Sequence, residues 1–286
     1  MNAFLFPGQG SQDVGMGKDL YENLTAAKYI LDEAVDILGY DLRELMLNGP
    51  IEKLTDTRYA QPAIYTCSAM HLEKAKADGI DYDYVAGHSL GEYSALYAAG
   101  VFSFENGLRL VEKRGKAMAD QNRKGTMAAV LGLTEEELTT ELVPDVVMAN
   151  LNSKTQIVLS GTETGIEEMT HKLESKGIIV KRLAVSAAFH SPQMQEAKVV
   201  MMTEINNLNF NAPIAAVVSN VTGRPTRIVS EIKENLINQI TGQVRWYDSI
   251  NTLVTEGIDQ FYEVGHGQVL RKMNRTITLN PRCLSI

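Results

Sequence analysis

The sequence predicts an α/β protein in which a smaller βαββαβ unit, residues 125–186, is inserted into a larger α/β domain formed by residues 1–124 and 187–286. Two changes of pattern predict this division. Strand-like and helical patterns alternate up to about residue 123, and a different order of elements follows over residues 126–186. The first alternation then resumes, as expected where a unit has been inserted into an α/β domain.

The first part of the large domain contains two strand candidates. Residues Ala3 to Phe6 form a short apolar strand that breaks at Pro7-Gly8 and leads into the glycine-rich loop GQGSQ. The segment DYDYVA (81–86) is the second candidate, and the turn GHSLG follows it directly. A helix over EYSALYAA comes next, and Gly100 is expected to close it because glycine readily adopts the left-handed conformation at helix ends.

The inserted unit is predicted from six segments in the order strand, helix, strand, strand, helix, strand. These are TMAAVLGL, TEEELTTEL, DVVMANLN, TQIVLSG, TGIEEMTHKLESKG and IIVKRLAV. Thr134/Glu137 and Thr164/Glu167 each have the spacing of a capping box that would open a helix, and Gly177 would close the second one. This order is that of a ferredoxin-like unit. The segments AAVVSNV, ENLINQI and QFYEVG then return to the pattern of the larger domain.

Composition excludes several classes of protein. A content of 44% hydrophobic and 22% charged residues is ordinary for a globular protein, and 286 residues can bury a sizeable core. The net charge of −8 argues against a general nucleic-acid binder, which needs a dominant basic face. No apolar run is long enough to cross a membrane, and the N-terminus lacks the pattern of a secretory signal. Cys67 and Cys283 have no metal-ligand spacing, so we expect reduced thiols in a cytoplasmic protein without a metal site.

The stretch GHSLGEY places Ser89 between two glycines, in a G-x-S-x-G pattern. The pattern alone is weak, but a strand before it and a small-residue helix after it are what a nucleophile elbow requires. The sharp turn would lift the hydroxyl off the sheet, and the helix N-terminus would supply amide donors for a developing oxyanion. The alternative is a glycine-flanked structural turn; the context favours the elbow.

A nucleophilic serine needs a base, and the chain has five histidines. His88 is adjacent in sequence, but its side chain would point away from the serine. His71 and His171 lie in charged helical segments that are expected to face solvent. Of the other two, His190 follows a strand and precedes a Ser-Pro helix start, whereas His266 lies in a Gly-x-Gly turn, so His190 is favoured. No aspartate or glutamate presents itself as a third triad member, which counts against an ordinary esterase.

Arg114 is the third candidate. A helix is predicted from Ser103 to about Ala119, and its apolar face consists of Phe104, Leu108, Val111, Gly115 and Met118. Arg114 falls on the flank of that face. It is either an arginine whose stem covers the edge of the core while its head reaches water, or a fixed guanidinium that binds a substrate carboxylate. Geometry read from the sequence leaves both interpretations open.

Six segments occur together and in order along the chain. They are FPGQGSQ at the N-terminus, QPAIY (61–65), GHSLGEYSAL (87–96), VEKRGKAM (111–118), VSAAFHSPQM (185–194) and YEVGHGQVL (262–270). This set closely resembles the malonyl-CoA:acyl-carrier-protein transacylase family over nearly the whole chain. The resemblance implies a hydrolase-like α/β core with an inserted ferredoxin-like subdomain, in agreement with the pattern of elements described above.

The resemblance also implies roles for individual residues. Ser89 would be the acyl-accepting nucleophile and His190 its general base. Gln239, in NQITGQVRW, would orient that histidine through its backbone carbonyl, which would explain the missing acid. Arg114 would hold the malonyl carboxylate. The remaining site residues implied are Gln9 and the amide of Leu90 for the oxyanion hole, and Gln61, Met118, Phe189 and Asn220 for the substrate pocket.

The resemblance further implies malonyl-CoA and an acyl carrier protein as partners, with no metal or redox cofactor. Lys154-Thr155, Ala187 and GHGQVL depart from sequences common in the family. These departures resemble free-standing acyltransferases that serve polyketide synthases in trans more than an enzyme of housekeeping fatty-acid synthesis. Phe189 before the histidine fits a malonyl rather than a methylmalonyl pocket.

Two rival functions are an editing hydrolase acting on carrier-protein thioesters and a non-catalytic scaffold. A hydrolase has no use for a carboxylate-binding arginine, and a scaffold has no use for an intact Ser89, His190 and Arg114 set. Carrier proteins of this kind are acidic, so a net negative enzyme needs a local basic patch for docking. The candidates are Lys181/Arg182 and Arg271/Lys272/Arg275.

Overall fold

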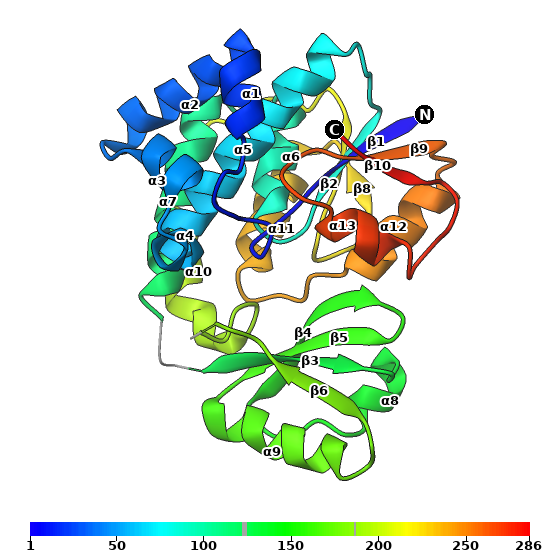
Figure 1. Ribbon diagram of the computed structural model, residues 1–286. Helices are drawn as coiled ribbons and strands as arrows, with labels where there is room; N and C mark the ends of the chain where they lie inside the picture. Colours follow the sequence, from blue (N-terminus) through cyan, green and yellow to red (C-terminus); the bar gives the residue numbers. More distant parts are fainter. Residues whose placement is uncertain (122–124, 186) are drawn as a thin grey trace.

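A computed structural model describes residues 1–121, 125–185 and 187–286 (Figure 1). Its larger sheet has the strand order β10-β9-β1-β2-β7-β8, and all neighbouring strands are parallel except β8, which is antiparallel to β7. The strands are β1 (Asn2–Phe6), β2 (Tyr84–Gly87), β7 (Ala216–Val218), β8 (Pro225–Thr226), β9 (Gln260–Glu263) and β10 (Cys283–Ser285). Strands separated in sequence by helices thus lie side by side, as in other α/β domains.

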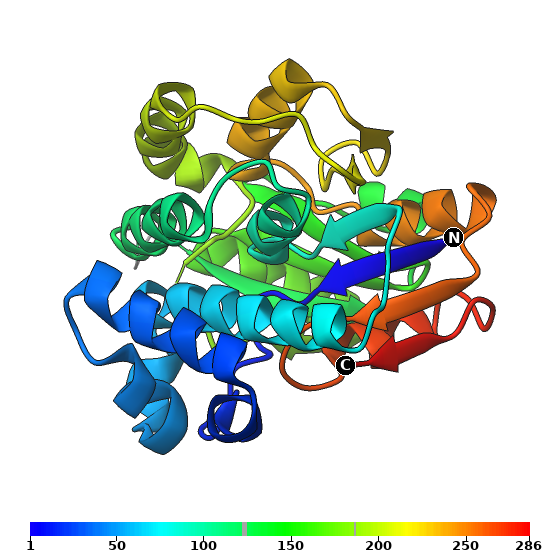
Figure 2. The same cartoon turned by 90° about the horizontal axis from the view of Figure 1, so that it is seen from above.

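Helices cover both faces of this sheet (Figure 2). They are α1 (Lys18–Asn23), α2 (Thr25–Leu38), α3 (Leu42–Asn48), α4 (Ile51–Thr55), α5 (Thr57–Ala77), α6 (Gly91–Ala98), α7 (Phe104–Ala119), η1 (Pro192–Met194), α10 (Gln195–Asn207), α11 (Val229–Gln239), α12 (Trp246–Thr255) and α13 (Val269–Asn274). Alternate residues of β1 serve the two faces: Phe4 and Phe6 belong to the apolar cluster with α5 and α7, whereas Ala3 and Leu5 pack in the cluster with α12 and α13. The sheet is therefore buried on both sides.

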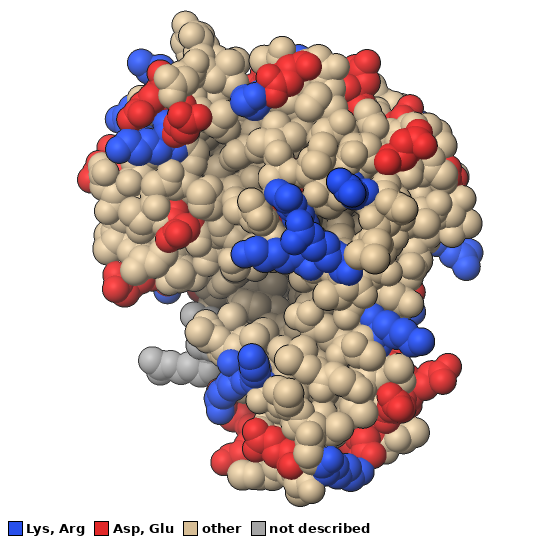
Figure 3. All heavy atoms as spheres, turned by 45° about the vertical axis from the view of Figure 1, so that its right-hand side comes forward, with Lys and Arg blue, Asp and Glu red and all other residues tan. Residues whose placement is uncertain are grey.

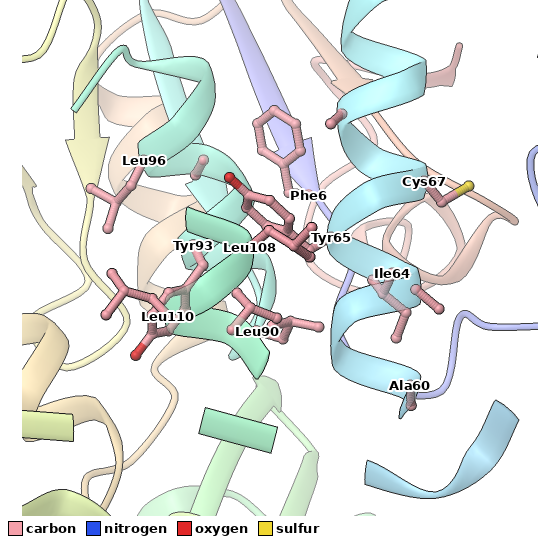
Figure 4. Packing of buried hydrophobic residues seen from close by; sticks show 14 of the residues in the cluster. Phe6, Ala60, Ile64, Tyr65, Cys67, Leu90, Tyr93, Leu96, Leu108 and Leu110 are labelled. Carbon is pink, nitrogen blue, oxygen red and sulfur yellow. The ribbon is translucent and has the colours of Figure 1, made fainter. Parts of the chain in front are cut away.

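The apolar cluster on the sheet face that carries Phe4 and Phe6 holds α5, α6 and α7 against one another. Figure 4 shows Phe6 and Tyr65 packed between α5 and the pair α6 and α7. Tyr65 is fully buried, and its ring stacks on Phe104 at 5.6 Å between centroids. Helix α7 begins after Ser103, whose side chain caps it, as its sequence pattern predicts. This packing holds in place α6, which begins two residues after Ser89, and α7, which carries Arg114.

The smaller sheet is antiparallel and has the strand order β4-β5-β3-β6. Its elements are β3 (Thr126–Leu131), α8 (Glu135–Thr139), β4 (Val146–Ser153), β5 (Gln156–Gly161), α9 (Glu163–Glu174) and β6 (Ile179–Arg182). These segments bury an apolar cluster of their own, formed by residues such as Val130, Ile157 and Leu173. The small sheet and its helices lie beneath the larger part in Figure 1.

The sequence predicts where several helices and strands begin and end, and the structure confirms some of these positions and contradicts others. The Thr134/Glu137 capping box is present and opens α8. The predicted Thr164/Glu167 box is wrong, because α9 begins earlier: Thr162 has an extended backbone, and its hydroxyl accepts from the amide of Gly165 at 3.1 Å. The predicted strands 81–86 and 178–185 begin and end differently from β2 and β6, which are four residues each.

None of the helices in the described ranges has the length and apolar character needed to span a bilayer. Over the same ranges, no group of three His, Cys, Asp or Glu side chains is arranged to hold a metal ion. Cys67 and Cys283 are both free thiols.

Candidate active site

Ser89 lies in the tight turn between β2 and α6, with a φ of 52° that a non-glycine residue rarely adopts. The glycines on either side are required by space. A Cβ at Gly87 would stand 1.9 Å from the carbonyl of Gly91, and one at Gly91 would stand 2.0 Å from the carbonyl of Phe6. Strand, turn and helix can pack this closely only without those side chains, and the strained serine is thereby presented at the end of the sheet.

His190 is in hydrogen-bond contact with the serine. Its Nε2 lies 2.7 Å from Ser89 Oγ, and its Nδ1 lies 2.8 Å from the backbone carbonyl of Gln239. A carbonyl can only accept, so Nδ1 carries the proton and Nε2 is free to accept one from the serine. A backbone carbonyl therefore occupies the orienting position that a carboxylate has in a Ser-His-Asp triad.

The environment of His190 keeps it neutral. Burial and the nearby charge of Arg114 lower the pKa of His190 to about 3. The imidazole is only 4% exposed. At neutral pH it is therefore unprotonated and able to act as a base.

Arg114 is buried at the centre of the site. Its side chain is 1% exposed, so it does not reach water, and the interpretation as an edge residue with a solvated head is wrong. Nη1 donates to Gln61 Oε1 at 2.7 Å, and Nη2 donates to Gln239 Oε1 at 3.0 Å and to Ser89 Oγ at 3.1 Å. In the described part of the chain no carboxylate lies within ion-pair distance of this guanidinium. A buried cation without a paired anion is an arrangement suited to an anionic ligand.

A second layer of hydrogen bonds holds the turn. Asn220 Oδ1 accepts from the amide of Ser89 at 2.7 Å, and its Nδ2 donates to the carbonyl of Gly87 at 2.6 Å. Gln239 Nε2 donates to the carbonyl of Ser89 at 2.8 Å and to Glu92 Oε2 at 2.8 Å. Residues from β2, α6, α11 and the loop after β7 thus fix the strained serine together.

A cavity of about 500 Å³ opens above the serine, between the large and small sheets. Ser89, His190, Arg114, Met118 and Phe189 all line it. The small sheet forms the other wall with Met127, Asn150, Asn152 and Val158, and the segment after β6 adds Val185. Figure 3 shows this hollow on the surface, with Lys and Arg side chains on both sides of it. A cavity with one buried cation, one nucleophile and apolar walls fits a small anionic acyl group.

Two cavity-lining residues have backbone amides that are candidates for an oxyanion hole. Gln9 and Leu90 both line the cavity, and Leu90 directly follows the serine. Within residues 1–121, 125–185 and 187–286, neither of these amides donates a hydrogen bond to the protein. Unused amides beside a nucleophile are what an oxyanion hole needs. The Gln9 side chain is held by a bond from Nε2 to Thr57 Oγ1 at 3.1 Å.

Gln61 and Asn220 do not line the cavity, contrary to expectation. Both are buried one layer behind it, at 1% and 0% exposure. Gln61 supports Arg114 and Asn220 supports the turn, because the guanidinium and the serine themselves occupy the cavity wall. They can therefore reach a ligand only through those residues.

Among the described residues, His190 is the histidine that hydrogen-bonds to Ser89 Oγ. His88 Nε2 is 2.8 Å from Asn152 Oδ1, and its ring packs near Trp246, so it joins the two sheets. His171 is exposed, as predicted. The prediction that His71 faces solvent is wrong: its Nδ1 lies 2.6 Å from the carbonyl of Ile286, and burial lowers its pKa to about 4. That partner is at the far end of the sequence, so the local charge pattern could not predict it.

Glu92 is the buried site residue that the sequence analysis missed. It is 2% exposed and accepts hydrogen bonds from Gln239 Nε2 and from the amide of Asn220 at 3.2 Å. A signal was present in the sequence. The helix EYSALYAA has small or apolar residues on every face, so a helix buried all round would also bury its one acidic residue.

Comparison with known proteins gives consistent matches. The family model described as the acyl transferase domain matches residues 3–280. The chain is similar to malonyl CoA-acyl carrier protein transacylase of Bacillus subtilis (strain 168), with 44% identity over 290 residues, 96% of this chain and 91% of the relative. It is also similar to the polyketide biosynthesis malonyl CoA-acyl carrier protein transacylase PksC of Bacillus subtilis (strain 168), with 42% identity over 277 residues and 94% of each chain. The crystal structure of malonyl-CoA:ACP transacylase from Synechocystis sp. PCC 6803 superposes with a TM-score of 0.94 at 38% identity, covering 100% of this chain and 96% of that one.

Proposed function

Because the chain belongs to the acyl transferase domain family, we propose that it moves a malonyl group from malonyl-CoA to the phosphopantetheine thiol of an acyl carrier protein. The observation that carries this proposal is one cavity holding a serine paired with a neutral histidine and a buried arginine without a carboxylate partner among the described residues. The serine and histidine support acyl transfer, and the arginine supports an acyl group that ends in a carboxylate.

The reaction has two halves. His190 Nε2 takes the proton of Ser89 Oγ as the oxygen attacks the malonyl thioester carbonyl, and the amides of Gln9 and Leu90 stabilise the oxyanion. The carbon–sulfur bond breaks, and the CoA sulfur leaves with the proton from the imidazole. The carrier's phosphopantetheine thiol then gives its proton to His190 and attacks the carbonyl of the malonyl-serine ester. The bond from that carbonyl carbon to Ser89 Oγ breaks, the malonyl group leaves as a thioester on the carrier, and His190 returns the proton to Ser89 Oγ.

The remaining site residues act on the acyl group or on the catalytic groups. Arg114 would bind the malonyl carboxylate, and Met118 and Phe189 would line the space beside its short carbon chain, where the family resemblance favours a malonyl over a methylmalonyl group. Gln239 orients His190 through its carbonyl, and the reaction needs no metal or redox cofactor. The hydrogen bonds and cavity lining described above support these assignments.

We also propose that residues 1–124 and 187–286 form a hydrolase-like core and that residues 125–186 form a ferredoxin-like subdomain. The parallel sheet with its serine turn supports the first assignment, and the order β3-α8-β4-β5-α9-β6 with sheet order β4-β5-β3-β6 supports the second. Residues 124 and 186, at the two boundaries, lie outside the described residues. The two free cysteines support a cytoplasmic location.

The proposed pathway is polyketide synthesis, with the enzyme acting in trans on a synthase's carrier protein. The similarity to PksC supports it, together with Lys154-Thr155 and Ala187, which depart from common family sequences. Arg114 disfavours an editing hydrolase, because unsubstituted acyl groups would leave its buried charge unpaired.

Intact-mass measurement tests the proposal directly. After mixing with malonyl-CoA, the protein is expected to gain one malonyl group, and Ser89→Ala is expected to gain none. Adding a carrier protein should move the group to the carrier, faster for a polyketide carrier than for a fatty-acid carrier. Loss of the group to water instead would indicate a hydrolase, and no adduct on the unmodified protein would refute malonyl transfer.

The proposed docking surface lies on both sides of the cavity mouth. Val269, Leu270 and Met273 of α13 line the cavity, and the same helix exposes basic residues, while Lys181 and Arg182 lie on edge strand β6. Charge reversal at Lys272 or at Lys181 is expected to raise KM for an acidic carrier about tenfold, with a smaller change in its kcat.

Lys76 provides the matched control for charge reversal. It is exposed at the end of α5, about 30 Å along the helix from Thr57, which lies two residues after the cavity-lining Thr55. Lys76→Glu should leave the carrier KM within twofold, as expected for a distant, screened charge on the order of several Debye lengths away. Equal effects of Lys76→Glu and Lys272→Glu would contradict a specific docking surface.

A further inference from the structure

Glu92 is a buried carboxylate that the proposed reaction does not use. It lies on α6, one helical turn beyond Ser89, and its amide donates to the carbonyl of that serine at 3.1 Å. One oxygen, Oε2, accepts two hydrogen bonds, from Gln239 Nε2 at 2.8 Å and from the amide of Asn220 at 3.2 Å. Among the described residues it makes no hydrogen bond to His190, so it is not a displaced third member of a triad.

The two donors to Glu92 hold different parts of the site. The Gln239 side chain accepts from Arg114 at 3.0 Å, and its backbone carbonyl holds His190 at 2.8 Å. The Asn220 side chain holds the strained turn from both sides, because it accepts from the amide of Ser89 and donates to the carbonyl of Gly87. One carboxylate oxygen therefore ties together the segments that fix the base, the cation and the nucleophile.

The carboxylate and the carbonyl of Ser89 together set which way the Gln239 amide faces. An amide side chain can turn over and exchange its oxygen and nitrogen, and an ionised carboxylate accepts hydrogen bonds only. Glu92 therefore adds a charged acceptor to the Ser89 carbonyl in holding the amide NH₂, which leaves Oε1 toward Arg114. In the opposite orientation the NH₂ would meet the guanidinium, donor against donor. The negative charge of Glu92 also partly balances the cation across this amide.

We propose that ionised Glu92 is a positioning residue, which holds Gln239 and Asn220, and through them the reacting groups, in their working arrangement. The inference rests on the malonyl transfer proposed above. Glu92 touches no substrate; its effect passes through the two residues that it binds.

The protonation of Glu92 gives this role a pH signature. Burial raises the pKa of Glu92 to about 7, although hydrogen bonds from Gln239 and Asn220 and the charge of Arg114 oppose the rise. The pKa of the carboxyl is above its usual value, so the ionised form is lost as the pH falls through about 7. His190, with a pKa of about 3, cannot cause a loss of rate in that range.

The neighbouring groups do not titrate there either. The charged group facing Glu92 from α7 is the Arg114 guanidinium, which stays protonated, α11 presents an amide, and the loop after β7 presents the amide of Asn220 and the hydroxyl of Ser219. Tyr93, on the same helix, has its pKa raised by burial to about 12.

The test is the second-order rate of Ser89 malonylation, followed by intact mass from about pH 5.5 to about pH 8.5. The acyl donor is malonyl-N-acetylcysteamine thioester, which has no phosphate to titrate. The unmodified protein should lose rate as the pH falls through about 7. Glu92→Gln should react at a nearly constant rate over this range, about tenfold slower at about pH 8, because its neutral amide loses the charge-assisted hydrogen bonds.

Glu263→Gln is the matched control. Glu263 is also fully buried, but it accepts from the amides of Leu270 and Arg271, and among the described residues it makes no hydrogen bond to the network around the serine. This variant should keep the loss of rate below about pH 7. Because stability itself depends on pH when a buried carboxyl has a shifted pKa, circular dichroism at each pH should show that the folded fraction is constant before the profiles are compared.

The results that would contradict the role of Glu92 differ from those that would contradict malonyl transfer itself. A loss of rate with falling pH that persists unchanged in Glu92→Gln, or no such loss in the unmodified protein, would overturn the role of Glu92 alone. If Glu92→Gln does not fold, Glu92→Asp should shift the pH at which rate is lost, and an unshifted profile would count equally against the role. Failure of the unmodified protein to gain a malonyl group would refute the proposed function first.

Discussion

His190→Ala is expected to lower the rate of Ser89 malonylation by about 10⁴-fold, the upper range for the loss of a general base. The expected size follows from geometry. His190 Nε2 is 2.7 Å from Ser89 Oγ, and Arg114 Nη2, the other side-chain group in contact with that oxygen, is a donor that cannot remove its proton. Without the imidazole, the serine must lose its proton to water in the cavity.

The measurement is single-turnover malonylation followed by intact mass. His171→Ala is the matched control, because His171 is an exposed histidine on α9 away from the cavity lining, and its rate should equal that of the unmodified protein. The mass adduct in His190→Ala should still depend on Ser89. A His190→Ala rate within tenfold of the unmodified rate would mean that another group removes the proton.

The elbow could be predicted from sequence because everything that makes it is local. A strand, a serine between two glycines and a small-residue helix occupy adjacent positions, and steric requirements at Gly87 and Gly91 act within a few residues. The pairing of Ser89 with His190 spans 101 residues, and elimination among histidines only favoured it. The identification of the Gln239 carbonyl as its partner came from the family resemblance, since any residue can supply a carbonyl.

Burial of charge is where sequence patterns were least informative. Arg114 and Glu92 are both nearly inaccessible, although charged residues are usually exposed. Each is stabilised by polar partners far away in sequence: Arg114 by Gln61 and Gln239, and Glu92 by Gln239 and Asn220. Local periodicity left Arg114 undecided because it reports the face of a helix and not what lies opposite that face.

Arg114→Ala is expected to reverse the preference between malonyl and acetyl groups. Malonylation should fall about 10²- to 10³-fold, because truncating one partner of a buried, hydrogen-bonded charge pair costs about 2–5 kcal/mol. Acetylation should rise about tenfold, since an acetyl group leaves the guanidinium desolvated and unpaired, and alanine removes that cost. The loss of the nearby positive charge also raises the pKa of His190 from its lowered value, which strengthens the base for either substrate.

Matched variants separate charge from space at this position. Arg114→Met fills much of the same volume without charge and should show the same reversal, so a reversal seen only with alanine would reflect an enlarged pocket. Arg114→Lys keeps the charge but lacks the planar fork, so it should retain part of the malonyl rate and keep acetylation slow. Rates for malonyl-CoA and acetyl-CoA measured side by side decide the matter: if both fall equally in Arg114→Met, the guanidinium supports the catalytic groups through Gln61 and Gln239 and does not select the acyl group.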